Sequence, residues 1–129
     1  MKMFSALVLA VLCLQASAAS AISPSGKFFC RADTMILCDG DGDCKKDKSR
    51  IAALVDFNSN TVTSLTVENS RPKPLLRAEA KGNSIVASNE VGNEFTITEQ
   101  PTSLGMTYSF KLVLTLGTGV MHFGSCNRA

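Results

Sequence analysis

The chain has 129 residues and a nearly balanced charge, with 13 Lys and Arg against 11 Asp and Glu, a formal net charge of +2 at pH 7. This length predicts one domain. Proteins dedicated to nucleic acids usually carry a strong basic excess, so we expect no nucleic-acid partner.

The first residues have the pattern of a secretory signal peptide. One cation, Lys2, precedes an apolar run over residues 6–14, and two A-x-A sequences follow, which end at Ala18 and Ala21. The run is shorter than the roughly 20 apolar residues that a membrane span needs. A cation, a short apolar run and a small-residue site are the parts of an export signal. We therefore predict a signal peptide over residues 1–18, cleaved after Ala18, with cleavage after Ala21 as the alternative.

Export determines how the remaining cysteines are interpreted. The predicted single domain covers residues 19–129, without a transmembrane segment, and we place it in the periplasm or outside the cell. It contains four cysteines: Cys30, Cys38, Cys44 and Cys126. An even number in an oxidising compartment predicts two disulfides, although four cysteines allow three different pairings.

Most of this domain alternates apolar and polar residues, which is typical of half-buried strands. In chain order, we expect strands over residues 27–32, 34–38, 51–57, 61–67, 76–81, 84–88, 94–99, 106–116 and 120–126. The clearest alternation runs from Met106 to Leu116. On the strand over residues 76–81, Leu76 and Ala78 alternate with charged residues. Residues 44–53 have room for one helical turn, and residues 71–74, with two prolines, predict an extended connector.

The short turns between these strands favour an all-β, antiparallel up-and-down meander of about eight to nine strands. An open meander would expose two strand edges to other chains. Closure removes both edges, so we predict a closed or nearly closed, disulfide-stapled barrel in which the strand with Phe28 and Cys30 pairs with the strand over residues 123–126. The architecture resembles lipocalin-type meanders, but the chain has no lipocalin signature motif. That resemblance implies an architecture and no function.

Closure of the barrel also favours one disulfide pairing. It brings Cys30 to the strand that holds Cys126, so we predict Cys30–Cys126 across the seam and Cys38–Cys44 as a small local ring. The competing arrangement joins Cys30 to Cys38 across the first hairpin and leaves Cys44 for Cys126.

The loop between Cys38 and Cys44 contains the sharpest local motif. Asp39, Asp41 and Asp43 alternate with glycines, and several carboxylate oxygens are what Ca²⁺ prefers. An EF-hand is excluded, because Cys44 stands at position six and Arg50 at position twelve, where that loop needs Gly and Glu. A weaker calcium site at these aspartates is one hypothesis. A solvated acidic turn, neutralised by the lysines that follow it, is the other.

No motif indicates catalysis. His122 is the only histidine, and if Met121 and Phe123 face the core it points outward or toward the seam. We expect it to be structural. A carboxylate pair of the glycosidase kind could form among four glutamates, but so small a domain seldom has the required cleft. Those residues are Glu79, Glu90, Glu94 and Glu99. We therefore predict that the protein is not an enzyme.

The best-supported function is that of a small exported binding or interaction protein, with an unknown protein or small molecule as partner and no cofactor. We expect a monomer. The many large inward side chains predict a filled core, so that binding would use the loops or the rim: Phe57, Phe95, Tyr108, Phe110, Leu112 and Leu114. An anionic partner could contact basic residues such as Arg71, Lys73 and Arg77, although a solvated loop is the simpler reading. The alternative function is a cation-binding structural protein that uses residues 39–43.

Overall fold

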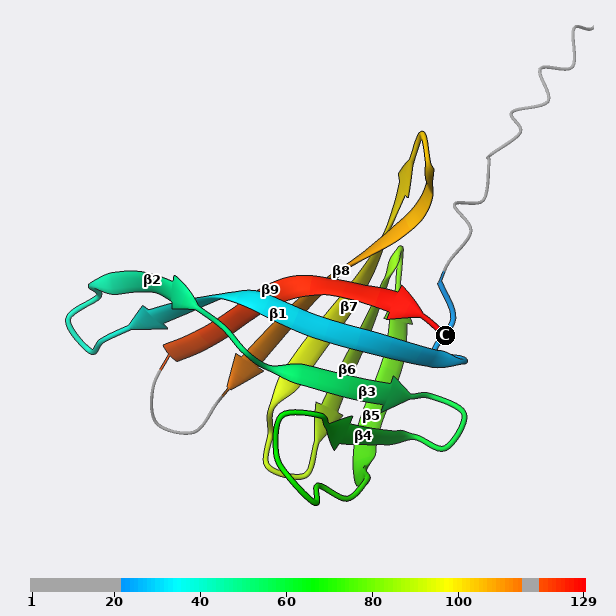
Figure 1. The fold of residues 1–129 in the computed structure, drawn as a ribbon, viewed down its shortest axis with the longest axis horizontal. Helices are drawn as coiled ribbons and strands as arrows, with labels where there is room; N and C mark the ends of the chain where they lie inside the picture. The colour runs from blue at the N-terminus through cyan, green and yellow to red at the C-terminus, as the bar shows by residue number, and fades with distance from the viewer. Residues whose placement is uncertain (1–21, 115–118) are drawn as a thin grey trace, which may run out of the picture.

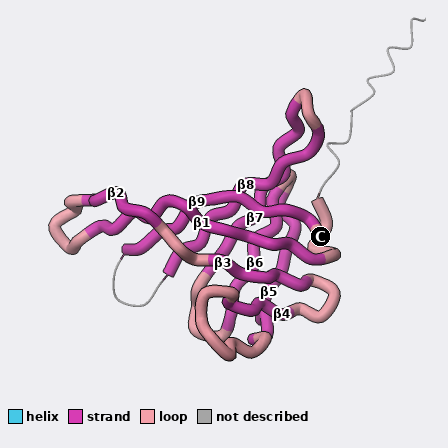
Figure 2. Tube along the Cα trace, in the orientation of Figure 1, coloured by secondary structure: helices cyan, strands magenta, loops and turns pink. Residues whose placement is uncertain are grey.

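The computed structural model describes residues 22–114 and 119–129, and these form one antiparallel sheet that closes into a barrel (Figure 1). Figure 2 shows strands and loops, and no helix, in this part of the chain. The strands are β1 (Lys27–Cys38), β2 (Cys44–Lys48), β3 (Ala52–Asp56), β4 (Thr61–Ser64), β5 (Lys73–Lys81), β6 (Ser84–Asn89), β7 (Glu94–Thr102), β8 (Gly105–Leu114) and β9 (Gly119–Arg128). The predicted signal peptide and both proposed cleavage sites lie outside the described residues.

The predicted meander and its closure are confirmed. From β3 to β9 each strand pairs with the next along the chain, and β1 pairs with both β3 and β9. Eight strands therefore close the barrel, and β2 lies outside the ring. The closing ladder between β1 and β9 extends from Phe28, opposite Arg128, to Cys38, opposite Gly119.

The predicted disulfides are confirmed as well. Cys30 lies directly opposite Cys126 in the β1–β9 ladder, and Cys38 lies directly opposite Cys44 in the β1–β2 ladder. Both pairs are bonded, each with its Cα atoms 4.0 Å apart. The competing Cys30–Cys38 pairing is therefore wrong. Cys30 and Cys126 are buried, so the seam bond belongs to the core.

A bulge in β1 explains two differences from the sequence-based expectation. The two predicted strands over residues 27–32 and 34–38 are one strand, whose register shifts between Ala32 and Thr34. Beyond the bulge, β1 remains paired with β9 but exchanges its other neighbour, β3, for β2, and the β1–β2 hairpin projects to one side (Figure 1). The expected helical turn in residues 44–53 is wrong, because the projecting half of β1 offers β2 a ladder. The lysines of β2 protect its free edge from pairing with another chain.

Gly124 lies where the bulge brings β1 and β9 together. A Cβ atom on Gly124 would lie 2.6 Å from the Cα of Ala32 and would also overlap the carbonyl oxygen of Arg31. Both contacts are to backbone, which cannot turn aside as a side chain can. The close approach of the two strands at the seam therefore requires a glycine.

One end of the barrel is tightly packed. The ring of Phe28 lies edge-on to Phe57 and to Tyr108, with centroids 5.8 and 5.2 Å apart, a favoured geometry for aromatic pairs. The guanidinium of Arg128 lies 5.3 Å from the centroid of Phe28, and Ile22 is buried in the same core cluster. This end, where β1 begins and β9 ends, is closed by side chains.

The strands β4 and β5 differ most from their predicted patterns. The register shifts between Leu75 and Arg77, so Leu75 is buried while Leu76, the residue expected to alternate inward, is 69% exposed. β4 ends at Ser64, and Leu65 and Val67 lie exposed in the following loop. The expected connector over residues 71–74 is partly strand, because β5 begins at Lys73. The alternation fails here because a bulge and an early strand end shift which residues face inward.

Candidate functional site: a cup at one end of the barrel

The end of the barrel opposite the Phe28 cluster is hollow. A cavity of about 600 Å³ opens there between β3, β4, β7 and β8, within the range of roughly 300–1,000 Å³ typical of small-molecule pockets. We call it the cup. Its apolar walls include Val55, Val62, Phe95, Phe110 and Leu112. The predicted filled core is thus correct for one end only, since Phe95, Phe110 and Leu112 line a space as well as pack.

Small residues explain why the cup stays open. Ala53 on β3 and Ser64 on β4 lie opposite each other in the ladder, and both line the cup. Ala53 also lies opposite Cys30, whose side chain is buried, so Ala53 faces the interior. Neither side chain reaches across to the aromatic wall of β7 and β8. The cup is therefore preformed by the sequence of its own strands.

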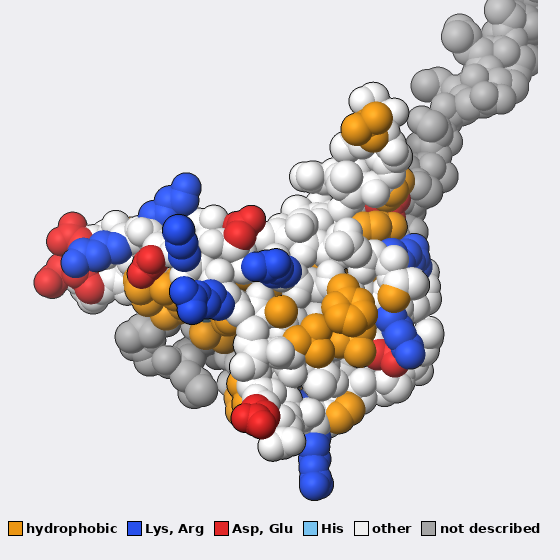
Figure 3. Space-filling view, in the orientation of Figure 1, with side chains coloured by type: hydrophobic (Ala, Val, Ile, Leu, Met, Phe, Trp, Pro, Cys, Tyr) orange, Lys and Arg blue, Asp and Glu red, His pale blue; other side chains and the backbone are white. Residues whose placement is uncertain are grey.

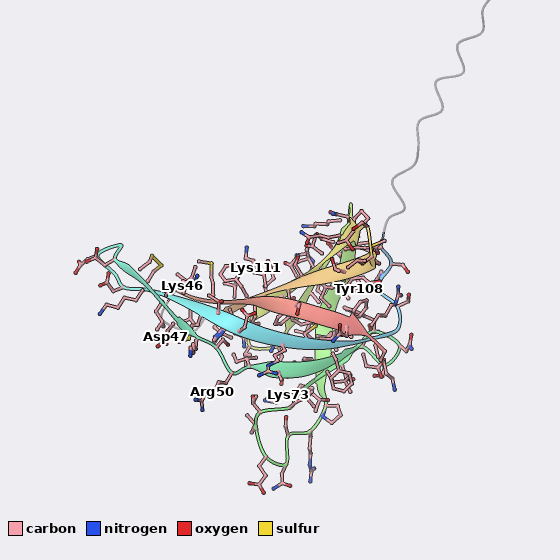
Figure 4. The ribbon with its side chains drawn as sticks, turned by 45° about the horizontal axis from the view of Figure 1, so that its top comes forward. Lys46, Asp47, Arg50, Lys73, Tyr108 and Lys111 are labelled. Carbon is pink, nitrogen blue, oxygen red and sulfur yellow. A yellow bond between two sulfur atoms is a disulfide. The ribbon has the colours of Figure 1, made fainter. Side chains whose placement is uncertain are left out.

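The mouth of the cup is polar and carries cations. The loop over residues 65–72 contributes Glu68 and Arg71 to the lining, and β5 contributes Lys73. Lys73 lies opposite Val62 in the β4–β5 ladder, and residues opposite each other share a face of the sheet. Because Val62 belongs to the apolar wall, Lys73 lies on the inward face although its side chain is exposed. Figure 4 labels Lys73 between β3 and the β4–β5 loop.

Among the residues that the structure describes, these cations have no carboxylate partner. The ion pairs among the described residues are Lys27–Asp56 and Arg77–Glu79. Arg71 and Lys73 are therefore not neutralised by an ion pair within the described part of the chain. An anionic group that enters the mouth would meet two available donors.

The wall of the cup also contains a buried side-chain oxygen, that of Asn93. The turn between β6 and β7 is held by the side-chain Oδ1 of Asn89, which accepts backbone N–H bonds from Val91 at 3.2 Å and from Asn93 at 3.0 Å. Asn93 lines the cup, and its own Oδ1 is buried with no hydrogen-bond partner in the described part of the chain. Such an atom costs about 1–3 kcal/mol. A ligand or a water that donates to it would recover part of that cost.

His122 lies inside the barrel, and not outside or at the seam as the sequence suggested. Its side chain is 5% exposed, and its Nδ1 lies 2.8 Å from the Oγ of Ser49. Burial lowers the pKa of its imidazole, which favours the neutral ring. The condition for an outward histidine is not met: Met121 and Phe123 are half-buried on the outer face. His122 shares its face with Cys126, four residues along the strand, as strand alternation requires.

The aspartate loop is a capped turn at the tip of the projecting hairpin. The Oδ1 of Asp39 accepts the backbone N–H groups of Asp41 and Asp43, both at 3.0 Å. All three residues are exposed. Within residues 22–114 and 119–129, no three acidic, histidine or cysteine side chains come together as a group that could hold a metal. Calcium binding by Asp39, Asp41 and Asp43 remains a prediction that nothing in the geometry favours.

The remaining charged candidates lie away from the cup. None of the four glutamates considered for catalysis lines it, and Glu79 pairs with Arg77 at 2.7 Å. Lys and Arg side chains gather over β2 and the adjoining part of β1 (Figure 3). A second, open hollow of about 550 Å³ lies there, lined by Arg31, Asp33, Lys48, Ser49, Arg50 and Ser125. It is a surface depression whose lining residues are all polar or charged.

No family model, curated protein or solved structure matches this chain. Among the described residues, no helix has the length and apolarity that crossing a bilayer would require. The two disulfides are consistent with an oxidising, exported location. Evidence for function therefore comes from the cup and the residues around it.

Proposed function

We propose that this protein is an exported, non-enzymatic binding protein that holds one small, mainly apolar molecule in the cup, in the periplasm or outside the cell. The observation that carries the proposal is the cavity of about 600 Å³ with apolar walls from four strands. Removing apolar surface from water is worth roughly 25 cal/mol per Å². A ligand that replaced water against Val62, Phe95 and Phe110 would gain from that effect.

The construction of the barrel supports a preformed site. An eight-stranded barrel can hold one small ligand in its interior. The seam disulfide joins the strands that close the ring, and the packed aromatic cluster fixes the other end. A cup that is already formed before binding loses little conformational freedom when a ligand enters, which favours affinity.

A neutral fluorescent dye tests this proposal directly. N-phenyl-1-naphthylamine becomes bright in apolar surroundings, and the protein has no Trp to obscure it. Titration of the oxidised protein should give a saturable rise in fluorescence with one site per chain. A variant that fills the cup, Ala53→Phe, should bind the dye at least about tenfold more weakly, which corresponds to about 1.4 kcal/mol.

The matched control places the same side chain on the outside of the barrel. Thr63 lies opposite Leu54, which lies opposite the exposed Phe29, so Thr63 is on the outer face. Thr63→Phe should bind the dye like the unmodified protein. Thermal unfolding of both variants shows whether they are folded. A folded Ala53→Phe variant that binds at full affinity, or the absence of any saturable site, would refute binding in the cup.

A further inference from the structure

We infer that the ligand of the cup is a single-chain amphiphile with an anionic head, held with its apolar chain inside and its head at Lys73. This inference rests on the proposed function and deepens it. The evidence is the placement of an unneutralised ammonium group on the inward face of a strand, at the mouth of an otherwise apolar cavity.

The side chain of Lys73 starts from the inward face of β5. Lys73 and Val62 face each other in the β4–β5 ladder, and both line the cup. Two residues further along β5, on the same face, Leu75 is buried in the core. A solvated strand lysine normally occupies the outer face, as Lys81 does at the other end of β5, exposed and outside the lining of the cup. Lys73 instead lies on the inward face at the start of β5, two residues before the buried Leu75.

The mouth of the cup carries more positive than negative charge. Arg71 and Lys73 line it together with one acidic residue, Glu68. The lining therefore has a formal excess of one positive charge. Neither cation forms an ion pair among the described residues. A carboxylate at the mouth would accept charge-assisted hydrogen bonds, which are stronger than hydrogen bonds between neutral groups.

The apolar and the polar surfaces of the cup are separate from each other. The aromatic and aliphatic walls come from the barrel strands, whereas the charged residues come from the β4–β5 loop and the start of β5. An alkyl chain matches the first surface and an anionic head matches the second. A neutral alkane would leave the cations unused, and a cationic amphiphile would be repelled by them.

Competition between three amphiphiles of equal chain length tests the inference. Dodecanoate, dodecanol and dodecylamine are titrated against protein loaded with N-phenyl-1-naphthylamine, the two ionic amphiphiles below their micelle concentrations and dodecanol below its solubility limit. At low ionic strength dodecanoate should bind about tenfold more tightly than dodecanol, equivalent to about 1.4 kcal/mol, and dodecylamine should bind most weakly. Added salt should reduce the preference, because it screens exposed charges.

Three lysine variants identify the group responsible. Lys73→Gln should abolish the preference for dodecanoate while dodecanol binds as before, and Lys73→Arg should retain it. Lys81→Gln removes a cation from the same strand away from the cup and should change nothing.

The failures of the two proposals are distinguishable. If the dye or dodecanol binds but dodecanoate binds no better, or if Lys73→Gln leaves the preference unchanged, the anionic head is refuted and the apolar cup stands. If the dye itself shows no saturable binding, the proposed function is wrong.

Discussion

Replacing Cys30 and Cys126 together by Ala should destabilise the barrel much more than replacing Cys38 and Cys44. Both bonds join residues directly opposite each other on neighbouring strands, but their sequence separations are 96 and 6 residues. Constraining the unfolded chain through loops of these lengths corresponds to about 4.7 and about 2.2 kcal/mol at 25 °C. The expected difference in the free energy of unfolding is therefore about 2.5 kcal/mol.

Burial acts in the same direction as loop length. Cys30 and Cys126 are within the core, so their removal also leaves unfilled space, whereas Cys44 is exposed. The β1–β9 ladder from Phe28 to Cys38 remains in the variant. We therefore expect a barrel that still folds but is less stable.

Urea unfolding followed by far-ultraviolet circular dichroism measures the difference. The midpoint and slope are compared for the oxidised protein and the two double variants, after peptide mapping under non-reducing conditions has confirmed the bonds. Equal losses, or a greater loss for the Cys38/Cys44 variant, would refute the reasoning from loop length.

Three further substitutions test individual features. Gly124→Ala should lower the free energy of unfolding by about 1–3 kcal/mol, the usual cost of overpacking, because its methyl group would meet the backbone of Arg31 and Ala32. Since burial lowers the pKa of His122 below its ordinary value of 6.5, the unfolded chain binds a proton first as the pH falls. The stability that depends on a neutral His122 is thus complete above pH 6.5 and declines below it, and His122→Gln should flatten this decline in urea midpoints. Asn93→Leu should leave stability unchanged or raise it, because it removes an unpartnered buried oxygen.

Each of these expectations has a contrary outcome. Ser125→Ala, at the exposed neighbour of Gly124, is the control for the seam, and equal effects of the two substitutions would show that the close approach is unimportant. An undiminished loss of stability below pH 6.5 in His122→Gln would assign that loss to other groups. A loss of more than about 1 kcal/mol in Asn93→Leu would mean that the amide is already satisfied.

The alternation of apolar and polar residues along the sequence predicts most of the fold. Strand β8 shows this best: Tyr108, Phe110 and Leu112 face inward as the pattern predicts, because a strand places every second side chain on the same face. The pairing of β1 with β9 could also be predicted. An open meander exposes its edges, and Cys30 and Cys126 lie on the two strands whose pairing closes the barrel. The same alternation, counted back from Cys126, would have placed His122 inside.

The alternation of residues does not predict the bulges or the cup. A bulge inserts one residue and reverses which side chains face inward, so the pattern of β5 misplaced Leu76 and concealed the inward position of Lys73. The hollow arises from the volumes of side chains on strands far apart in sequence, such as Ala53 and Phe110. Local patterns predict which face of a strand a residue occupies, but not whether its side chain touches the side chains on the opposite wall of the barrel.

The ladder between β4 and β5, beside the cup, is the shortest in the barrel. Residue pairs join β4 to β5 at only two positions, Thr61–Pro74 and Val62–Lys73, whereas β7 and β8 pair from Glu94 to Thr102. Local opening tends to occur where few backbone bonds and contacts hold a segment. We therefore expect β4 and β5 to separate more readily than the strands of the long ladders, which would give a ligand a second way into a cup whose other walls stay fixed. Hydrogen exchange should be fastest at Val62 among the barrel strands and should slow when the cup is filled.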